Sequence, residues 1–171
     1  CDWSSDVCSS DLPVPLMGGT GPGNMLSMTI LGNCEVLSML CLVQAASPDT
    51  PFIYAPALAV MNPRTGMLSS GAIENGLLSS AAVEMARYYE LPVEGSGGGT
   101  DTHAPGIQST YERSLNVMLP MLSWPDLMVG AGLLGGSMIL SLEQLVIDAE
   151  MFRMNKQAHR GINADGNSWL D

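Results

Sequence analysis

Residues 71–95 read GAIENGLLSSAAVEMARYYELPVEG, and this stretch contains both kinds of secondary structure that decide the fold. Up to Glu90, apolar residues recur at intervals of three and four, which predicts an amphipathic helix over residues 72–89. The following LPVEG is a short apolar run that ends in glycine, as buried strands commonly do. The stretch is therefore a helix followed by a strand, the unit from which α/β proteins are built.

The same unit recurs along the chain. Short apolar runs begin at residues 13, 51, 91 and 127, so their starts are 38, 40 and 36 residues apart. A helical pattern follows each run, over residues 26–46, 72–89, 105–123 and 142–160. A connection of this length brings the next strand back in the same direction, so the pattern predicts a parallel sheet.

Two parallel architectures fit such a pattern, an open doubly wound sheet and a barrel. A doubly wound sheet usually has a dinucleotide fingerprint or a phosphate loop after one strand. Here GxGxxG is broken twice, by Asn24 and by Thr100 at the last glycine position, and the chain has no GK[ST]. We therefore predict the α/β class and a partial (β/α)8 TIM barrel of about four consecutive βα units. A whole barrel takes about 250 residues, so the length of this chain fits part of one. Half a barrel leaves its first and last strands unpaired, and we therefore expect it alone to be marginally stable or to aggregate.

The two ends of the chain are set apart from this domain. Residues 1–12, CDWSSDVCSSDL, have no hydrophobic period and resemble the translation of a sequencing adapter, so we interpret them as non-native. Residues 13–162 are assigned to the partial barrel and residues 163–171 to a tail. Cys34 and Cys41 lie seven residues apart in one apolar helical pattern, where we expect them to be small buried side chains.

The charge pattern restricts the partners. The net charge is -11 and Lys156 is the single lysine. The chain therefore has no run of basic residues that could bind nucleic acid or a membrane surface. The long apolar stretches are interrupted by polar residues such as Asn33 and Glu35, which argues against a membrane span. No secretory signal is apparent, and we expect a cytoplasmic location.

Reactive groups of parallel barrels gather at the carboxyl ends of the strands. That rule selects Tyr54, Glu94, Asp101 and His103 as residues that bind a cationic ligand, the acids by charge and the tyrosine through its ring face. Ordinary packing of Tyr54 and capping of the next helix by Asp101 stay open. Two histidines without a nearby cysteine or acid at ligand spacing argue against zinc.

Glycines mark the same ends. Gly97, Gly98, Gly99 and Gly132 would let the backbone approach a bulky cofactor, although strand-to-helix turns require glycine in any case. Farther along, the acids Glu143, Asp148 and Glu150 do not share one helix face, so a solvated or interdomain face is expected for them.

Four motifs, in this order and spacing, give the chain a family resemblance from about residue 13 to residue 162. They are PLMGGTGP at 15–22, ARYYELP at 86–92 with Glu74 in the preceding GAIE, GGTDTHAPGIQSTYE at 98–112 and SLEQLVIDAE at 141–150. Together they resemble the trimethylamine methyltransferase (MttB-like) family of corrinoid-dependent methyltransferases, and the chain looks like part of its C-terminal half. Gly106 and Thr110 depart from the family pattern, which has an acid and a glycine there.

The resemblance implies a TIM barrel and a reaction. A methyl group would pass from a quaternary, betaine-like, or tertiary methylamine to Co(I) of a separate corrinoid protein. The corrinoid would be carried by that partner and not bound by this chain alone, and homo-oligomerisation stays open. Two alternatives remain: another TIM-barrel enzyme that binds a phosphorylated ligand at GLLGGS, residues 132–137, or a protein that binds a methylamine without catalysis.

Overall fold

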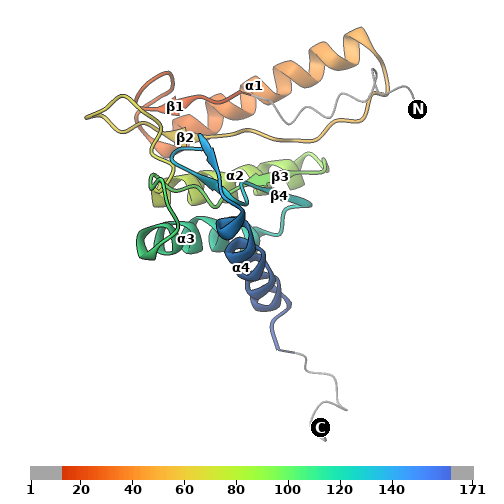
Figure 1. Ribbon diagram of the computed structural model, residues 1–171. Helices are drawn as coiled ribbons and strands as arrows, with labels where there is room; N and C mark the ends of the chain where they lie inside the picture. Colours follow the sequence, from red (N-terminus) through yellow and green to blue (C-terminus); the bar gives the residue numbers. More distant parts are fainter. Residues whose placement is uncertain (1–12, 163–171) are drawn as a thin grey trace, which may run out of the picture.

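The computed structural model describes residues 13–162, so the interpretations of residues 1–12 and 163–171 lie outside the described residues. Four helices follow one another along the chain: α1 (Met25–Ala46), α2 (Ile73–Tyr88), α3 (Ile107–Ser123) and α4 (Leu142–Arg160). The strands are short: β1 (Leu16–Met17), β2 (Ala59–Val60), β3 (Glu94–Ser96), β4 (Leu127–Val129), β5 (Leu133–Leu134) and β6 (Ile139–Leu140). Figure 1 shows the four helices in chain order, with the strands between them. The α/β class and the four predicted helices are confirmed.

Side-chain caps account for where α1 and α4 begin. The Asn24 side chain accepts a hydrogen bond of 2.9 Å from the backbone N–H of Ser27, which starts α1. The Ser141 hydroxyl does the same for the N–H of Gln144 and starts α4. These caps satisfy N–H groups that have no partner inside the helix.

The first four strands, β1 to β4, pair in parallel and in chain order. β1 pairs with β2, Leu16 opposite Ala59, and β3 pairs with β4, Glu94 opposite Leu127. A single parallel bridge between Tyr54 and Val93 links the two pairs. The expected second strand at 51–55 was therefore placed too early, because only this bridge forms there and the ladder lies at Ala59–Val60. Pro56 explains the interruption, since proline has no N–H to donate to a ladder.

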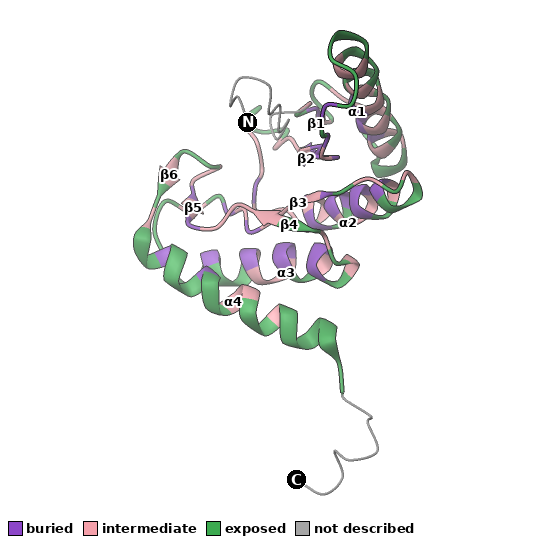
Figure 2. Cartoon of the chain, turned by 90° about the vertical axis from the view of Figure 1, so that its right-hand side faces the viewer, coloured by how far each residue is buried: buried purple, intermediate pink, exposed green. Residues whose placement is uncertain are grey.

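The helices pack on one another and on one face of the strands. α2 lies between α1 and α3, and α4 packs on α3 (Figure 2). The main cluster of buried side chains joins α1, α2 and the segments that lead into β2 and β3, and its members are Val36, Phe52, Tyr54, Ala82, Val83, Ala86 and Val93. Burying these side chains provides the main stabilisation of this layer.

α1 is covered on one side only. Met28, Gly32 and Val36 are buried, whereas Leu26 is 73% exposed and Leu42 is 66% exposed. Cys34 and Cys41 are also exposed, so the expectation that they are buried was wrong. By length and composition alone α1 could cross a membrane, but the core helices of soluble proteins pass the same test.

Between β4 and α4 the chain forms an antiparallel hairpin of β5 and β6, with Leu133 opposite Leu140. From the sequence, GLLGGS at 132–137 was considered as a site for a phosphorylated ligand, and no hairpin was predicted. Gly135 and Gly136 both have positive φ values, which glycine adopts without steric cost, and they form the turn.

Candidate functional site

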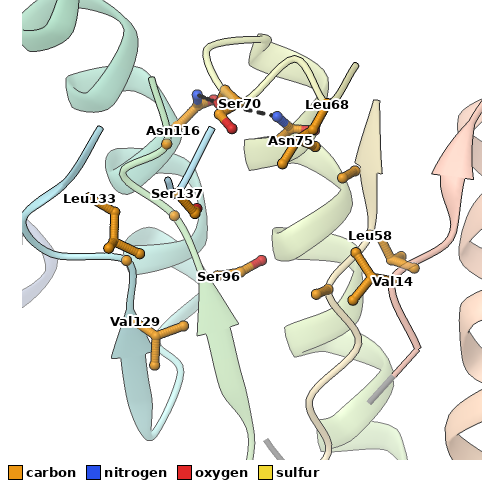
Figure 3. A pocket seen from close by; sticks show the side chains of 15 residues that line it. Val14, Leu58, Leu68, Ser70, Asn75, Ser96, Asn116, Val129, Leu133 and Ser137 are labelled. Carbon is orange, nitrogen blue, oxygen red and sulfur yellow. Dashed lines mark hydrogen bonds between the residues drawn. The ribbon is translucent and has the colours of Figure 1, made fainter. Parts of the chain in front are cut away.

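A cavity of about 410 Å³ lies at the carboxyl ends of β3 and β4 and extends to the segment that leads into β2. Figure 3 shows it between the β3–β4 pair and the β1–β2 pair, with Ser70, Asn75 and Asn116 together at one end. Its lining includes Leu58, Ser96, Gly97, Gly99, Val129 and Leu133. At β3 and β4 the cavity therefore lies at the carboxyl ends, where the sequence predicts the reactive groups.

The lining is largely apolar, and none of the described residues in it is charged. Its polar end is held by amide side chains. Asn75 donates 2.7 Å to the carbonyl of Ser69 and accepts 3.0 Å from the N–H of Val60. Asn116 donates 3.1 Å to the carbonyl of Ser70, while its buried Oδ1 has no hydrogen-bond partner among the described residues. Such a pocket suits a small, mostly apolar ligand.

Tyr54 lies on the helix side of the strands and not in this cavity. Its hydroxyl donates 3.0 Å to Oδ1 of Asn33, whose Nδ2 donates 3.0 Å to the hydroxyl of Tyr89. The ring is 1% exposed, and burial raises the pKa of Tyr54 well above its ordinary value. The structure thus gives Tyr54 the packing role that the sequence left open.

Asp101 joins two loops. Its Oδ1 accepts 2.6 Å from the backbone N–H of Ser70 and its Oδ2 accepts 3.0 Å from the hydroxyl of Ser69. Helix α3 begins only at Ile107, with Gly106 as its N-cap residue, so Asp101 does not cap that helix. It fixes the segment before α2 against the segment after β3.

Glu94 is the first residue of β3, and His103 lies in the segment that follows β3. His103 is exposed and packs beside the β5–β6 turn, where a Cβ added to Gly135 would lie 3.1 Å from its Cδ2. Glu94 is half-buried at the start of β3. Because side chains alternate along a strand, Glu94 shares the face of Ser96, which lines the cavity, and not that of Val93, which lies in the core.

Three of the four selected glycines, Gly97, Gly98 and Gly99, lie in the loop directly after β3. Gly97 and Gly99 line the cavity, and Gly98 has a φ of +71°. A Cβ on Gly99 would lie 2.7 Å from the carbonyl oxygen of Ser70, so close backbone contact already requires glycine here. Gly132 is not in the lining, and its N–H donates 2.7 Å to Oδ2 of Asp148.

Two buried charged residues behind the cavity were missed. Arg113 of α3 is 0% exposed and pairs with Asp148 of α4, which is 1% exposed. The expected solvated or interdomain position was therefore wrong for Asp148. One signal in the sequence could have indicated a buried polar face: Gln144 and Asp148 lie four residues apart and therefore on the same face of the helix. The Gln144 amide donates 2.8 Å to Asp148 Oδ1.

Glu112, also missed, organises the loop after β3. Its carboxylate accepts 2.5 Å from the Thr100 hydroxyl, 3.1 Å from the Asp101 N–H and 2.6 Å from the Gln108 amide. Burial by itself raises the pKa of Glu112, but the three hydrogen bonds to the charged form outweigh it and lower the pKa below its ordinary value.

Backbone N–H groups of the GLLGGS segment, residues 132–137, already donate hydrogen bonds to other parts of the protein. The N–H of Gly135 donates 2.7 Å to the carbonyl of Thr102, and that of Gly136 donates 3.0 Å to the carbonyl of Thr100. With the N–H of Gly132 bound to Asp148, three of the donors that a phosphate loop would present are already in use. This arrangement does not favour the phosphate alternative.

Comparison with known proteins agrees with the resemblance. The sequence pattern of the trimethylamine methyltransferase (MTTB) family matches residues 6–170. Over 151 residues the chain is 34% identical to trimethylamine methyltransferase MttB of Methanosarcina barkeri (strain Fusaro / DSM 804), an alignment that covers 88% of this chain and 30% of that protein. It is 32% identical to the glycine betaine methyltransferase of Desulfitobacterium hafniense (strain Y51), over 88% of this chain and 32% of that protein.

The chain thus spans about a third of the length of the curated relatives it matches. Its family match covers all of the residues that carry the helices, the strands and the cavity. The chain belongs to the trimethylamine methyltransferase (MTTB) family.

Proposed function

We propose that the complete polypeptide containing this chain transfers a methyl group from a quaternary or tertiary methylamine to the Co(I) centre of a separate corrinoid protein. The observation that carries the proposal is the family match over residues 6–170. The relatives support the substrate class, since one bears the name trimethylamine methyltransferase and another the name glycine betaine methyltransferase.

We propose further that the four βα units form part of a (β/α)8 barrel. Each strand segment pairs in parallel with the next along the chain, through β1–β2, the Tyr54–Val93 bridge and β3–β4. A doubly wound sheet would instead reverse its strand order at a switch point. The proposal accounts for the uncovered side of α1, which the remainder of the polypeptide would cover.

We propose that the cavity takes the amine, while the corrinoid stays on its partner protein. At about 410 Å³ the cavity is of the size of small-molecule sites. The Co(I) centre of the partner's corrinoid would supply the nucleophile. In the transfer the carbon–nitrogen bond would break as the methyl carbon bonds to Co(I), and its electron pair would stay on nitrogen. A quaternary amine then leaves as a neutral amine, whereas a tertiary amine must first be protonated. Either substrate must be held with a methyl group directed toward the cavity mouth.

The residues of this chain would then orient the amine and exclude water. Apolar side chains such as Leu58, Val129 and Leu133 suit methyl groups. We propose that Glu94, on the cavity face of β3, offsets the positive charge of the substrate. His103 lies on the exposed rim, and Asp101 holds that rim in place. Gly97 and Gly99 are not proposed as corrinoid contacts, because Asn116 and Ser70 already occupy the space that a Cβ would fill there. We propose a cytoplasmic location for this chain.

The test uses the complete polypeptide with its corrinoid protein under reducing conditions, and trimethylamine or glycine betaine as methyl donor. Mass spectrometry of the amine is expected to show dimethylamine or dimethylglycine accumulating in step with methylated corrinoid. Binding of the amine without any demethylated product would instead support a non-catalytic binding protein.

A further inference from the structure

Arg113 and Asp148 together bind the backbone of the loop that follows β4. The Arg113 Nε donates 2.9 Å to Asp148 Oδ1, and Nη2 donates to Asp148 Oδ2. The same guanidinium donates to two carbonyl groups, from Nη2 to Gly130 at 2.9 Å and from Nη1 to Leu133. Asp148 Oδ2 accepts 2.7 Å from the N–H of Gly132. One buried ion pair thus holds three backbone groups within four residues.

Stability alone does not explain this pair. A buried ion pair loses the hydration of both charges, and apolar residues of similar size are often equally or more stabilising in its place. Apolar side chains cannot, however, satisfy the carbonyl and N–H groups of residues 130–133. The specific contribution of the pair is therefore the conformation of this loop, which Gln144 supports through its hydrogen bond to Asp148.

The loop held in this way forms one wall of the cavity. Gly130 and Leu133 line the cavity, and so does Ser137 in the β5–β6 turn. The far end of the hairpin is fastened to the loop after β3, since the N–H groups of Gly135 and Gly136 donate to the carbonyls of Thr102 and Thr100. Arg113 and Asp148 are not in the lining, so they act on the wall from behind.

We propose that Arg113 and Asp148 are positioning residues that set the wall formed by residues 130–137 against the bound amine. The identity of the ligand rests on the proposed function, whereas the effect on the loop does not. Neither side chain lines the cavity, so neither is proposed as a catalytic residue.

The decisive variant is the double substitution Arg113→Met/Asp148→Leu in the complete polypeptide. It removes both charges together, so no unpaired charge is left behind and the protein is expected to fold. The exposed pair Arg153 and Glu150 on α4 provides the matched control, Arg153→Met/Glu150→Leu. Two quantities are measured, the KM for the amine and the hydrogen exchange of the amides of residues 130–137.

We expect the KM of the double variant to rise about tenfold, which corresponds to the loss of one good contact with the ligand. Amide exchange of Gly132 should accelerate, because its N–H loses its acceptor. The control should keep both parental values. A role in stability alone would lower the amount of active enzyme without changing the KM.

A double variant that folds with the parental KM would overturn the proposal, whether or not its loop exchanges faster. If it fails to fold, Gln144→Met takes its place, and a raised KM of smaller size with faster exchange of Gly132 is required. If the unaltered polypeptide demethylates no amine, the proposed function fails. The positioning role is then judged by exchange alone, and parental protection of residues 130–133 would refute it.

Discussion

The carboxylate of Asp101 accepts a hydrogen bond of 2.6 Å from the backbone N–H of Ser70, a residue 31 positions earlier in the chain. The bond joins the segment after β3 to the segment before α2, at the polar end of the cavity. Ser70 is 5% exposed, so bulk water is a poor substitute for this acceptor.

Asp101→Ala is therefore expected to lower the free energy of unfolding of the complete polypeptide by about 1–3 kcal/mol, the cost of an unsatisfied buried donor. Urea unfolding of the variant and of the unaltered polypeptide measures this loss of unfolding free energy. Ser69→Ala serves as the control, since it removes only the 3.0 Å bond from the Ser69 hydroxyl. Equal losses for the two variants would show that the bond to Ser70 is not the important one.

Gly130→Ala tests the close approach of two loops. A Cβ on Gly130 would lie 2.0 Å from the carbonyl oxygen of Gly97, and the φ of Gly130 is +104°. Overpacking and an unfavourable φ together are expected to cost at least about 2 kcal/mol of unfolding free energy. Gly23→Ala, which has open space around it, should change the same quantity by less than about 0.5 kcal/mol. A Gly130→Ala variant as stable as Gly23→Ala would mean that the two loops are not in contact.

Glu112 makes the stability depend on acid pH. Its pKa is lower in the folded protein than the ordinary value of 4.5, so its contribution is complete above that value. The contribution is lost as the pH falls through the lower, folded-state pKa. Glu112→Gln should therefore flatten the fall in unfolding free energy at acid pH, and Gln108→Met, which removes one of three donors, should flatten it less. Chemical denaturation across the acid range measures both, and a slope that is the same in all three proteins would contradict this role.

Residues 13–162 alone are expected to associate. α1 leaves Leu26, Ile30 and Leu42 exposed, and among the described residues β1 and β4 each pair on one side only. Light scattering and binding of an apolar dye should be high for this segment and low for the complete polypeptide at the same concentration. A segment that stays monomeric and unfolds cooperatively would show that the uncovered side of α1 needs no further chain.

Much of the fold could be predicted because the helices follow one rule. Apolar residues at intervals of three and four placed α4 at its observed bounds and the other helices within two residues of theirs. The second strand was misplaced because Pro56 breaks an apolar run that otherwise looks continuous. The β5–β6 hairpin was missed because GLLGGS was considered as a ligand site, although its glycines form a turn.

The candidate site could be approached from the sequence only through the rule about strand ends. That rule selected Gly97 and Gly99, and both line the cavity. The face on which Tyr54 lies depends on strand register, which pairing decides and which a single sequence does not display. Arg113 and Asp148 are 35 residues apart, and only the packing of α3 on α4 brings them together.

The measurement that tests the central proposal most directly is the absorbance of Co(I) in a reduced corrinoid mixed with the complete polypeptide and one methylated amine. Trimethylamine and glycine betaine are tested separately, and a reaction without polypeptide corrects for spontaneous methylation. We predict that at least one amine removes the Co(I) absorbance in proportion to the demethylated amine formed. An absorbance that stays constant with every methylated amine, in the presence of correctly folded polypeptide, would contradict the proposed methyl transfer.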